Sequence, residues 1–352
     1  MKKKELQGVK EIARRANVAI ATVDRVIHNR TGVSAKTRDK INNIIAELNY
    51  QPNLLARRLA SGKTISIAVL IPAVTEETDF WEAPRRGIQQ AEAEIRQYGI
   101  TVTLFFFNLN DPDSFKTQAN QILDSSVDGI VLAPSFVDAA QVFTAACEQA
   151  GIPFVFIDAD IPGQKKLSYI GPPLFQSGYL AGKLSTYGLR ETSQLLVVNI
   201  ATSLDSFTYR QIEAGFRAYF AEHAPTYPIL RADIQQTDFD SIASHLQQLF
   251  DTNPNIDAVF VSNSRVFSVA RFLDGQQPAS RPILIGYDFV SENIRFLASG
   301  TIDFLICHQP KDQGYRSIMV LYQHLVLSAP VAKEYYMPID IVTRENQAFY
   351  RN

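Results

Sequence analysis

The stretch from Val9 to Leu59 constrains the fold most, because it holds three short helical periodicities separated by tight breaks. The apolar positions of the three predicted helices are Val9, Ile12 and Ala13, then Thr22, Val23, Val26 and Ile27, then Ile41, Ile44, Ile45 and Leu48. A break at Ala16-Asn17-Val18 has the length that lets two helices cross at a wide angle. This order predicts a helix-turn-helix, the arrangement in which the second helix lies in the major groove of DNA.

Charge separates this N-terminal head from the rest of the chain. Residues 1–63 carry fourteen lysines and arginines against five acidic residues, a net charge of +9. The whole chain has a net charge of −2, so the remainder carries −11. A basic head on an acidic body is expected when only the head meets a polyanion. The alternative is a solvated basic three-helix domain that binds protein.

Length and composition exclude several classes of protein. The chain has 352 residues, which suits two or three domains, and 46% of them are hydrophobic. No apolar run reaches the roughly 18–20 residues of a membrane helix, so no membrane partner is expected. Polar residues follow Met1, so we expect a cytoplasmic protein rather than an exported one. Cys147 and Cys307 lack metal-ligand spacing, and no metal or cofactor is predicted.

Two segments of the head resemble the LacI/GalR transcriptional regulators. They are Val-Ser-Ala-Lys-Thr-Arg at 33–38 and Ala-Glu-Leu-Asn-Tyr-Gln-Pro-Asn at 46–53. The resemblance implies binding to operator DNA as a homodimer, with residues 52–63 forming a hinge helix and Leu59 levered between base pairs in the minor groove. The implied DNA-contacting residues are Ile20, Ala21, Thr22, Arg25, His28, Ser34, Thr37, Tyr50, Asn53, Ala56 and Leu59.

Several of these roles have alternatives. Arg25 has the chemistry to donate two bonds to guanine, or it is a solvated arginine. Ser34 either caps the third helix by accepting from the N–H of Thr37 or touches phosphate. Leu59 could instead pack on its own body. Asp24 is an acid where this family has serine, and it could hold Arg25 or Lys10 in place.

From Thr64 onward, short apolar strands alternate with amphipathic helices, which predicts doubly wound parallel sheets. The predicted strands are 65–71, 101–107, 129–133, 154–157, 195–200, 229–234, 258–262, 283–286 and 304–307. The predicted helices are 85–98, 115–125, 139–150, 175–187, 210–222, 239–250 and 293–299. The pattern restarts near Phe175, so two similar α/β lobes follow the all-α head.

This body resembles the periplasmic sugar-binding fold of the ribose and galactose type. The resemblance implies that the chain crosses between lobes near Tyr169-Ile170, Cys307-His308 and Tyr336-Met337. We therefore expect a headpiece at 1–51, a hinge helix and linker at 52–63, and a two-lobed effector-binding and dimerisation domain at 64–352. The expected lobes are 64–170 with 308–336, and 171–307 with 337–352.

Polar and aromatic side chains follow the strands of both lobes. Ligands of such sheets sit outside the carboxyl ends of the strands. A mixture of aromatic rings, carboxylates and amides suits a small sugar or sugar derivative, because rings stack on its C–H faces and charged groups bind its hydroxyls strongly. The candidate effector residues are Thr78, Phe80, Trp81, Asp158, Arg210, Phe239, Asn263, Asp288, His308 and Gln309.

The resemblance assigns stacking to Phe80, Trp81 and Phe239, and hydroxyl binding to Asp158, Arg210, Asn263 and Asp288. His308 aligns with a glutamine of the family, and Gln309 is adjacent, so both are kept. Three of these residues have structural alternatives. Asp288 could cap a turn, Arg210 could pair with Asp205, and Trp81 could be core packing.

Together these features predict a transcriptional regulator that acts as a repressor. A small sugar is expected to control its affinity for the operator. A sugar-acting enzyme is the alternative, although no phosphate loop, Ser-His-Asp signature or zinc motif occurs and no catalytic residue is predicted. A sugar-binding transporter component would not need a DNA-binding head. The sequence leaves open whether the sugar is an inducer or a corepressor.

Overall fold

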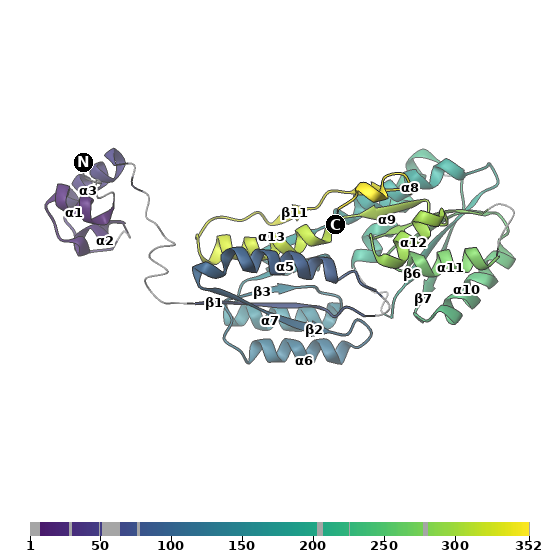
Figure 1. Cartoon of the computed structure of the whole chain (residues 1–352), viewed down its shortest axis with the longest axis horizontal. Coiled ribbons are helices and arrows are strands. Elements are labelled where there is room, and N and C mark those ends of the chain that lie inside the picture. Colours follow the sequence, from purple (N-terminus) through teal and green to yellow (C-terminus); the bar gives the residue numbers. More distant parts are fainter. Residues whose placement is uncertain are drawn as a thin grey trace. The chain divides into compact units, whose positions relative to one another are not determined.

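A computed structural model describes residues 8–27, 30–48, 50, 64–75, 78–202, 207–224, 226–276 and 281–351. The chain divides into two compact units, Met1–Gly62 and Lys63–Asn352 (Figure 1). The predicted hinge helix at 52–63 lies outside the described residues. So do four of the predicted DNA contacts, His28, Asn53, Ala56 and Leu59.

The first unit contains the three predicted helices, α1 (Val9–Ala16), α2 (Ile20–Ile27) and α3 (Ala35–Glu47). Asn17 ends α1 in the left-handed conformation, with φ 55°, which a short polar side chain tolerates. Lys40 on α3 donates to the carbonyl oxygen of Ala16 at 2.9 Å and so satisfies one of the last carbonyls of α1. Seven buried side chains from the three helices form the core: Ile12, Ala13, Ala16, Val23, Val26, Ile41 and Ile44.

The second unit contains two six-stranded sheets, which confirms the predicted α/β class. The first sheet is parallel throughout. Its strands, in spatial order, are β11 (Glu334–Tyr336), β5 (Ser168–Gly171), β4 (Phe154–Ile157), β3 (Gly129–Leu132), β1 (Ile65–Pro72) and β2 (Ile100–Phe107). Helices α5 (Glu82–Ile95) and α13 (Pro310–Leu325) cover one face, and α6 (Pro112–Leu123) and α7 (Val137–Ala150) cover the other (Figure 1).

The second sheet repeats this layout with one antiparallel edge strand. Its order is β12 (Asp340–Val342), β10 (Phe304–Cys307), β9 (Ile283–Tyr287), β8 (Ile256–Val261), β6 (Gln194–Ile200) and β7 (Ile229–Ile234), with β12 antiparallel to β10. Its helices are α8 (Leu174–Ser185), α9 (Phe207–His223), α10 (Phe239–Thr252), α11 (Val266–Gln276) and α12 (Ser291–Ser299). The chain also has short 3₁₀ turns. These are η1 (Arg96–Tyr98), between α5 and β2 of the first lobe, and η2 (Thr186–Gly188) and η3 (Gln347–Phe349) in the second.

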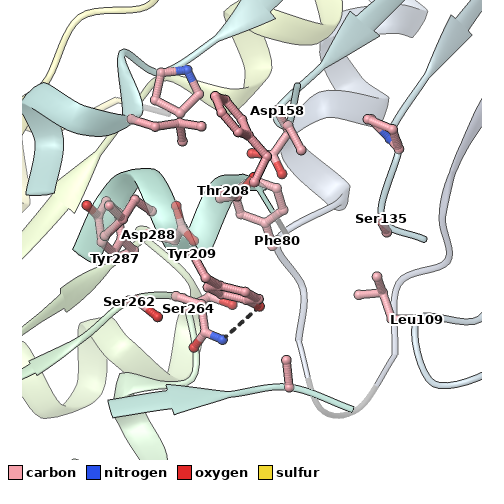
Figure 2. Close-up of a pocket in the computed structure, with 18 of the residues that line it drawn as sticks. Phe80, Leu109, Ser135, Asp158, Thr208, Tyr209, Ser262, Ser264, Tyr287 and Asp288 are labelled. Carbon is pink, nitrogen blue, oxygen red and sulfur yellow. Dashed lines mark hydrogen bonds between the residues drawn. The ribbon is translucent and has the colours of Figure 1, made fainter. Parts of the chain in front are cut away.

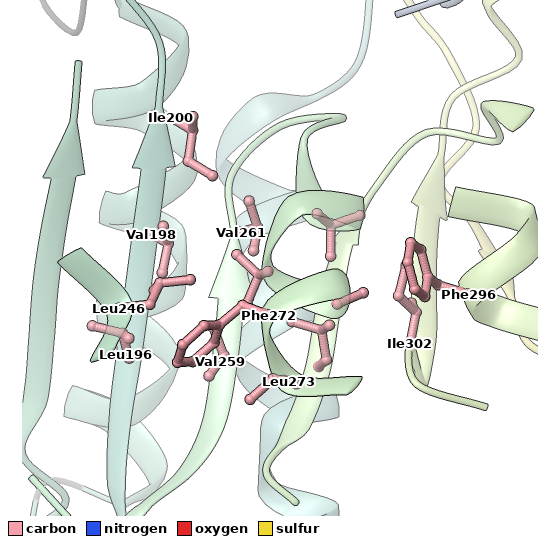
Figure 3. Close-up of a cluster of buried hydrophobic side chains, with 14 of the residues drawn as sticks. Leu196, Val198, Ile200, Leu246, Val259, Val261, Phe272, Leu273, Phe296 and Ile302 are labelled. Atoms are coloured by element: carbon pink, nitrogen blue, oxygen red, sulfur yellow. The ribbon is translucent and has the colours of Figure 1, made fainter. Parts of the chain in front are cut away.

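The second sheet is buried on both faces, because successive residues of its central strands point to opposite sides. Leu196, Val198 and Ile200 of β6 pack with Leu246 of α10 and Phe272 of α11 (Figure 3). The alternate residues of β6 belong to a second cluster, in which Phe216 of α9 stacks on Phe260 of β8 at 4.9 Å. A strand whose two faces are both buried needs apolar residues at nearly every position, which is why these strands are almost continuously apolar.

Five elements that the sequence did not predict complete the lobes: β5, α11, α13, β11 and β12. Tyr169 and Ile170, where the first crossing was expected, lie inside β5, so the chain leaves the first sheet only after Gly171. It returns between β10 and α13, and crosses again between β11 and β12. Among the described residues, no helix combines the length and apolar character needed to span a bilayer.

Hydrogen bonds tie the three crossings to one another. The backbone N–H of Met337 donates to the carbonyl of Gly171, which joins the third crossing to the first. The side chain of Gln309 donates to Asp340 at 2.8 Å, which joins the second crossing to the third. The segments between the lobes therefore form one connected layer.

Each lobe also contains one pair of helices that touch backbone to backbone through glycines. A Cβ added to Gly178 of α8 would lie 1.9 Å from the carbonyl oxygen of Ile212, and one added to Gly215 of α9 would lie 1.9 Å from that of Phe175. In lobe one, Gly87 of α5 meets the carbonyl of Lys311 in the same way, at 1.8 Å. These contacts leave no room for any side chain.

We predict that Gly215→Ala lowers the free energy of unfolding by about 1–3 kcal/mol, because the new methyl group forces α8 and α9 apart. The matched control is Gly275→Ala in α11, where a Cβ meets nothing within 4 Å. That substitution should stabilise the protein by up to about 1 kcal/mol, since alanine is the better helix former. Urea unfolding measures both, and equal effects of the two would contradict the close-contact account.

Candidate functional site

A cavity of about 210 Å³ lies at the carboxyl ends of the strands, lined by residues of both lobes (Figure 2). This is the position expected for a ligand of open α/β sheets. Seven of the ten predicted effector residues line it: Thr78, Phe80, Trp81, Asp158, Asn263, Asp288 and His308. The remaining three do not, and each has another place in the fold.

Asp158 and Asp288 occupy equivalent positions in the two lobes. Asp158 directly follows β4, and its backbone N–H donates to Ile170 of the neighbouring strand at 3.0 Å. Asp288 directly follows β9, and its N–H donates to Ile306 at 3.0 Å. Both are left-handed, with φ 70° and 73°, a conformation that aspartate adopts more readily than most residues. The two lobes thus present one carboxylate each to the same cavity.

The cavity raises the pKa of both carboxyl groups. Burial raises the pKa of Asp158 to about 6. Burial, and then the negative charge of Asp158, raise the pKa of Asp288 well above its ordinary value. No donor to either carboxylate occurs among the described residues, so a ligand with hydroxyl groups would supply hydrogen bonds that these residues do not provide.

Two buried side chains, Tyr169 and Asn293, form hydrogen bonds to the main chain at and near Asp158 and Asp288. The hydroxyl of Tyr169 lies 3.0 Å from the carbonyl oxygen of Pro172 and 3.2 Å from that of Asp158, so its one hydrogen is shared between these two acceptors. The amide nitrogen of Asn293 donates to the carbonyls of Asp288, Tyr287 and Ser264, at 3.1, 2.9 and 2.9 Å. Tyr169 and Asn293 contact main-chain atoms rather than the cavity. A search for polar side chains directly after each strand therefore did not identify them.

An aromatic wall faces the acids from lobe one. Phe80 meets Trp81 edge to face, with ring centroids 5.2 Å apart. Trp81 is only 4% exposed, so it both packs in the interior and contributes to the cavity lining. Phe80 is half-buried and stands among the cavity residues with its ring available for stacking (Figure 2).

His308, rather than Gln309, lines the cavity. Its ring stacks on Tyr287 with centroids 5.5 Å apart, and it is 5% exposed. Burial lowers the pKa of His308 to about 3, so the imidazole is neutral at physiological pH. Its Nε2 is buried without a hydrogen-bond partner among the described residues. Gln309 instead donates to Asp340 in the crossing layer.

Arg210 and Phe239, both predicted from the resemblance, do not line the cavity. Arg210 is an exposed residue of α9. Phe239 begins α10, packs against the core of lobe two, and lies under the guanidinium of Arg271 at 3.9 Å. The arginine that does line the cavity is Arg265, whose Nη1 donates to the carbonyl of Ile200 at 3.3 Å.

Arg265 stands two residues after the predicted Asn263, in the loop after β8, so extending the strand-end search by two positions would have found it. The amide nitrogen of Asn263 donates to Ile200 at 2.7 Å and to the hydroxyl of Tyr209 at 3.3 Å (Figure 2, dashed line). Its oxygen accepts from the N–H of Arg265 at 3.1 Å. Asn263 therefore organises this side of the cavity as well as lining it.

The first unit presents a different kind of surface. On α2, Ile20 is 49% exposed, and Ala21 and Arg25 are exposed beside it. Thr22 is half-buried. Asp24 accepts from Arg30 at 3.3 Å, a partner that the sequence analysis did not name. The face of α2 that is predicted to contact DNA is thus exposed, and its acidic residue Asp24 is bonded to Arg30.

Ser34, Thr37 and Tyr50 also contribute to the structure of this unit. Ser34 caps α3, as predicted, by accepting from the N–H of Thr37 at 3.3 Å, and the two hydroxyls are 2.8 Å apart. Tyr50 packs, half-buried, against the core of the three helices. Ser34 is exposed, so its hydroxyl remains accessible at the surface.

Comparison with known proteins gives two family matches. Residues 67–327 match the family described as periplasmic binding protein domain. Residues 8–53 match the family described as bacterial regulatory proteins, lacI family. Catabolite control protein A of Staphylococcus aureus is 36% identical over 121 residues, 34% of this chain and 35% of that protein. The aligned part thus spans about a third of that relative's length.

Two solved structures are similar to this chain. One, from Bacteroides fragilis and assigned to the LacI transcriptional regulators, has a TM-score of 0.76 at 29% identity, over 82% of this chain and 100% of that one. The other is GanP, a glucose-galactose binding protein from Geobacillus stearothermophilus, with a TM-score of 0.71 at 20% identity, over 81% and 99%. The second likeness concerns the fold alone.

We predict that Asp158→Asn stabilises the ligand-free protein at pH 7. The ordinary aspartate pKa is about 4, so the unfolded chain loses this proton first and stability falls as pH rises from about 4 to about 6. Asparagine removes that slope and should raise the free energy of unfolding at pH 7 by roughly 1–3 kcal/mol. Urea unfolding between pH 4 and pH 8 measures it.

The control is Asp160→Asn in the same cavity. Asp160 pairs with Lys166 at 2.7 Å, and both side chains are largely buried, so its removal should destabilise the protein at pH 7. An Asp158→Asn variant that is no more stable than the wild type at pH 7, or that keeps its pH slope, would show that burial of Asp158 carries no cost. A stabilised Asp160→Asn variant would show that the gain is not specific to Asp158.

Proposed function

The chain belongs to the periplasmic binding protein domain family and carries a lacI-family regulatory domain, and we propose that it is a sugar-controlled, DNA-binding transcriptional regulator. The observation that carries this proposal is the union, in one chain, of an open helix-turn-helix face with a cavity lined from two lobes. The first provides a surface for the major groove, and the second provides a site whose occupation can change how the lobes are arranged.

The proposed ligand is a single uncharged sugar ring. Asp158 and Asp288 accept hydroxyl hydrogen bonds from opposite lobes, and Phe80 stacks on a C–H face. An anionic sugar would bring like charge against Asp158 and Asp288 wherever they are ionised, and neither has a donor among the described residues. Among the described residues that line the cavity, Asp160 is paired with Lys166, and Arg265 is a cation that donates to the carbonyl of Ile200, so the acids Asp158 and Asp288 outnumber the cation left to face an anion. Uronic acids and sugar phosphates should therefore bind more weakly than neutral pentoses or hexoses.

Linkage sets what the ligand does to DNA binding. A sugar changes operator affinity only by as much as it prefers one arrangement of the protein over another. We propose that the protein binds the operator as a homodimer, as the two-fold symmetry of helix-turn-helix sites favours. Repression is the proposed effect on transcription, and either sign of sugar control is compatible with this scheme.

We predict that Arg25→Ala weakens binding to the specific operator by about 1–3 kcal/mol and relaxes the preference at one base pair. Arg14→Ala is the matched control, because Arg14 is also exposed but pairs with Glu11 at 2.6 Å on α1. Fluorescence anisotropy with operator and random DNA measures both. If Arg25→Ala lost the same affinity for operator DNA and for random DNA, Arg25 would contact phosphate rather than a base.

We predict that a thermal-shift screen of pentoses, hexoses, uronic acids and sugar phosphates finds a neutral sugar as the strongest stabiliser. For that sugar, Asp288→Asn should lose about ten- to a hundredfold in affinity, since a buried hydroxyl loses a charged acceptor. Arg210→Ala should keep affinity within about twofold, because Arg210 lies outside the cavity lining. Titration calorimetry measures both variants.

The same sugars separate this proposal from an enzyme. The cavity has two carboxylates, which is also the equipment of a glycosidase. Incubating the protein with the sugar and its glycosides, followed by product analysis, should show binding without turnover. If the protein formed product and Asp288→Asn abolished that activity, the proposed function would be wrong and the cavity would be an active site.

A further inference from the structure

One side chain bridges the mouth of the cleft without lining the cavity. Asp79 stands between the cavity residues Thr78 and Phe80 in lobe one. Its carboxylate accepts from the hydroxyl of Ser291 in lobe two, and both of its oxygens lie 3.4 Å from the backbone nitrogen of Ser291. Ser291 comes three residues after Asp288, so this contact joins the ligand-facing loops of the two lobes.

The contact has the chemistry of a helix cap. Ser291 is the first residue of α12, and Val290 before it makes no side-chain cap hydrogen bond. The first N–H groups of a helix have no partner within it and carry partial positive charge, which a carboxylate satisfies. Helix α10 shows the usual local solution, where Asp238 of the same lobe accepts from the N–H of Ser241 at 2.9 Å. In α12 the cap comes from the other lobe.

We propose that Asp79 is a positioning residue that holds the two lobes together in the free protein by capping α12 across the cleft. It opposes the repulsion that arises when Asp158 and Asp288 are both ionised, since they face one cavity from opposite lobes with no donor to either among the described residues. The balance of these two interactions sets the proportion of closed molecules before any ligand arrives. A ligand that donates hydrogen bonds to the two acids offsets the repulsion and acts in the same direction as the cap.

The test measures the separation of the lobes in the ligand-free full-length protein. Spin labels on Asn120→Cys in α6 and Gln248→Cys in α10 report it by double electron–electron resonance, since both positions are exposed. Cys147 and Cys307 are 0% and 1% exposed, so they do not take up the label. Dilution with unlabelled protein confines the measured distances to one chain.

Asp79→Ala should raise the ratio of open to closed molecules by about two- to thirtyfold, the range expected for loss of a helix N-cap. Ser291→Pro should do the same, because it removes both donors to Asp79. Proline suits the first position of a helix, and the extended Val290, at φ −93° and ψ 157°, is compatible with a following proline. Asp238→Ala is the matched control, which removes a cap within lobe two and should leave the distance distribution unchanged.

Wild-type distances in both Asp79→Ala and Ser291→Pro would overturn the proposal. So would an equal widening in Asp238→Ala, since the change would then reflect general loosening of lobe two. The measurement uses neither sugar nor DNA, so its outcome does not depend on the proposed function.

Discussion

Close contact between helix backbones at paired glycines is the constraint on which both lobes depend. In lobe one the contact joins α5, near the start of the body, to α13, which follows every strand of the second sheet except its edge strand β12. The chain must therefore leave lobe one and return to it before the first lobe is complete, which takes two crossings, and the final passage from β11 to β12 adds a third. The cleft, the strand ends that line it and the crossing layer all follow from this interleaving.

The two lobes use one plan twice, and the site depends on the repetition. Each has a glycine-paired helix couple on one face of its sheet, and each ends a central strand in a left-handed aspartate. Facing each other, these strand ends bring Asp158 and Asp288 to a common cavity at a cost in stability that neither acid would incur in water. That cost is characteristic of a binding site, where groups are arranged for a ligand rather than for the free protein.

Much of this was predictable from residue patterns. Apolar periodicity located the three helices of the head and most elements of the body, because each buries a continuous face. It missed α11 and α13, and the short β5, β11 and β12, whose few residues carry no periodicity of their own. The strand-end rule brought seven candidates to one cavity. It could not separate His308 from Gln309, since adjacent residues differ only in which way the backbone turns them. Arg210 and Phe239, to which the resemblance assigned ligand contacts, do not line this cavity.

The bonds within the crossing layer restrict how the lobes can move. Three separate connections would allow each lobe to shift, twist or draw away independently. Because Met337 is bonded to Gly171 and Gln309 to Asp340, the three segments move together. Rotation of one lobe against the other about this layer leaves these bonds intact, whereas independent sliding of the lobes would break them. A change beside the cavity is therefore expected to turn one lobe against the other, because that motion keeps the bonds between the crossings.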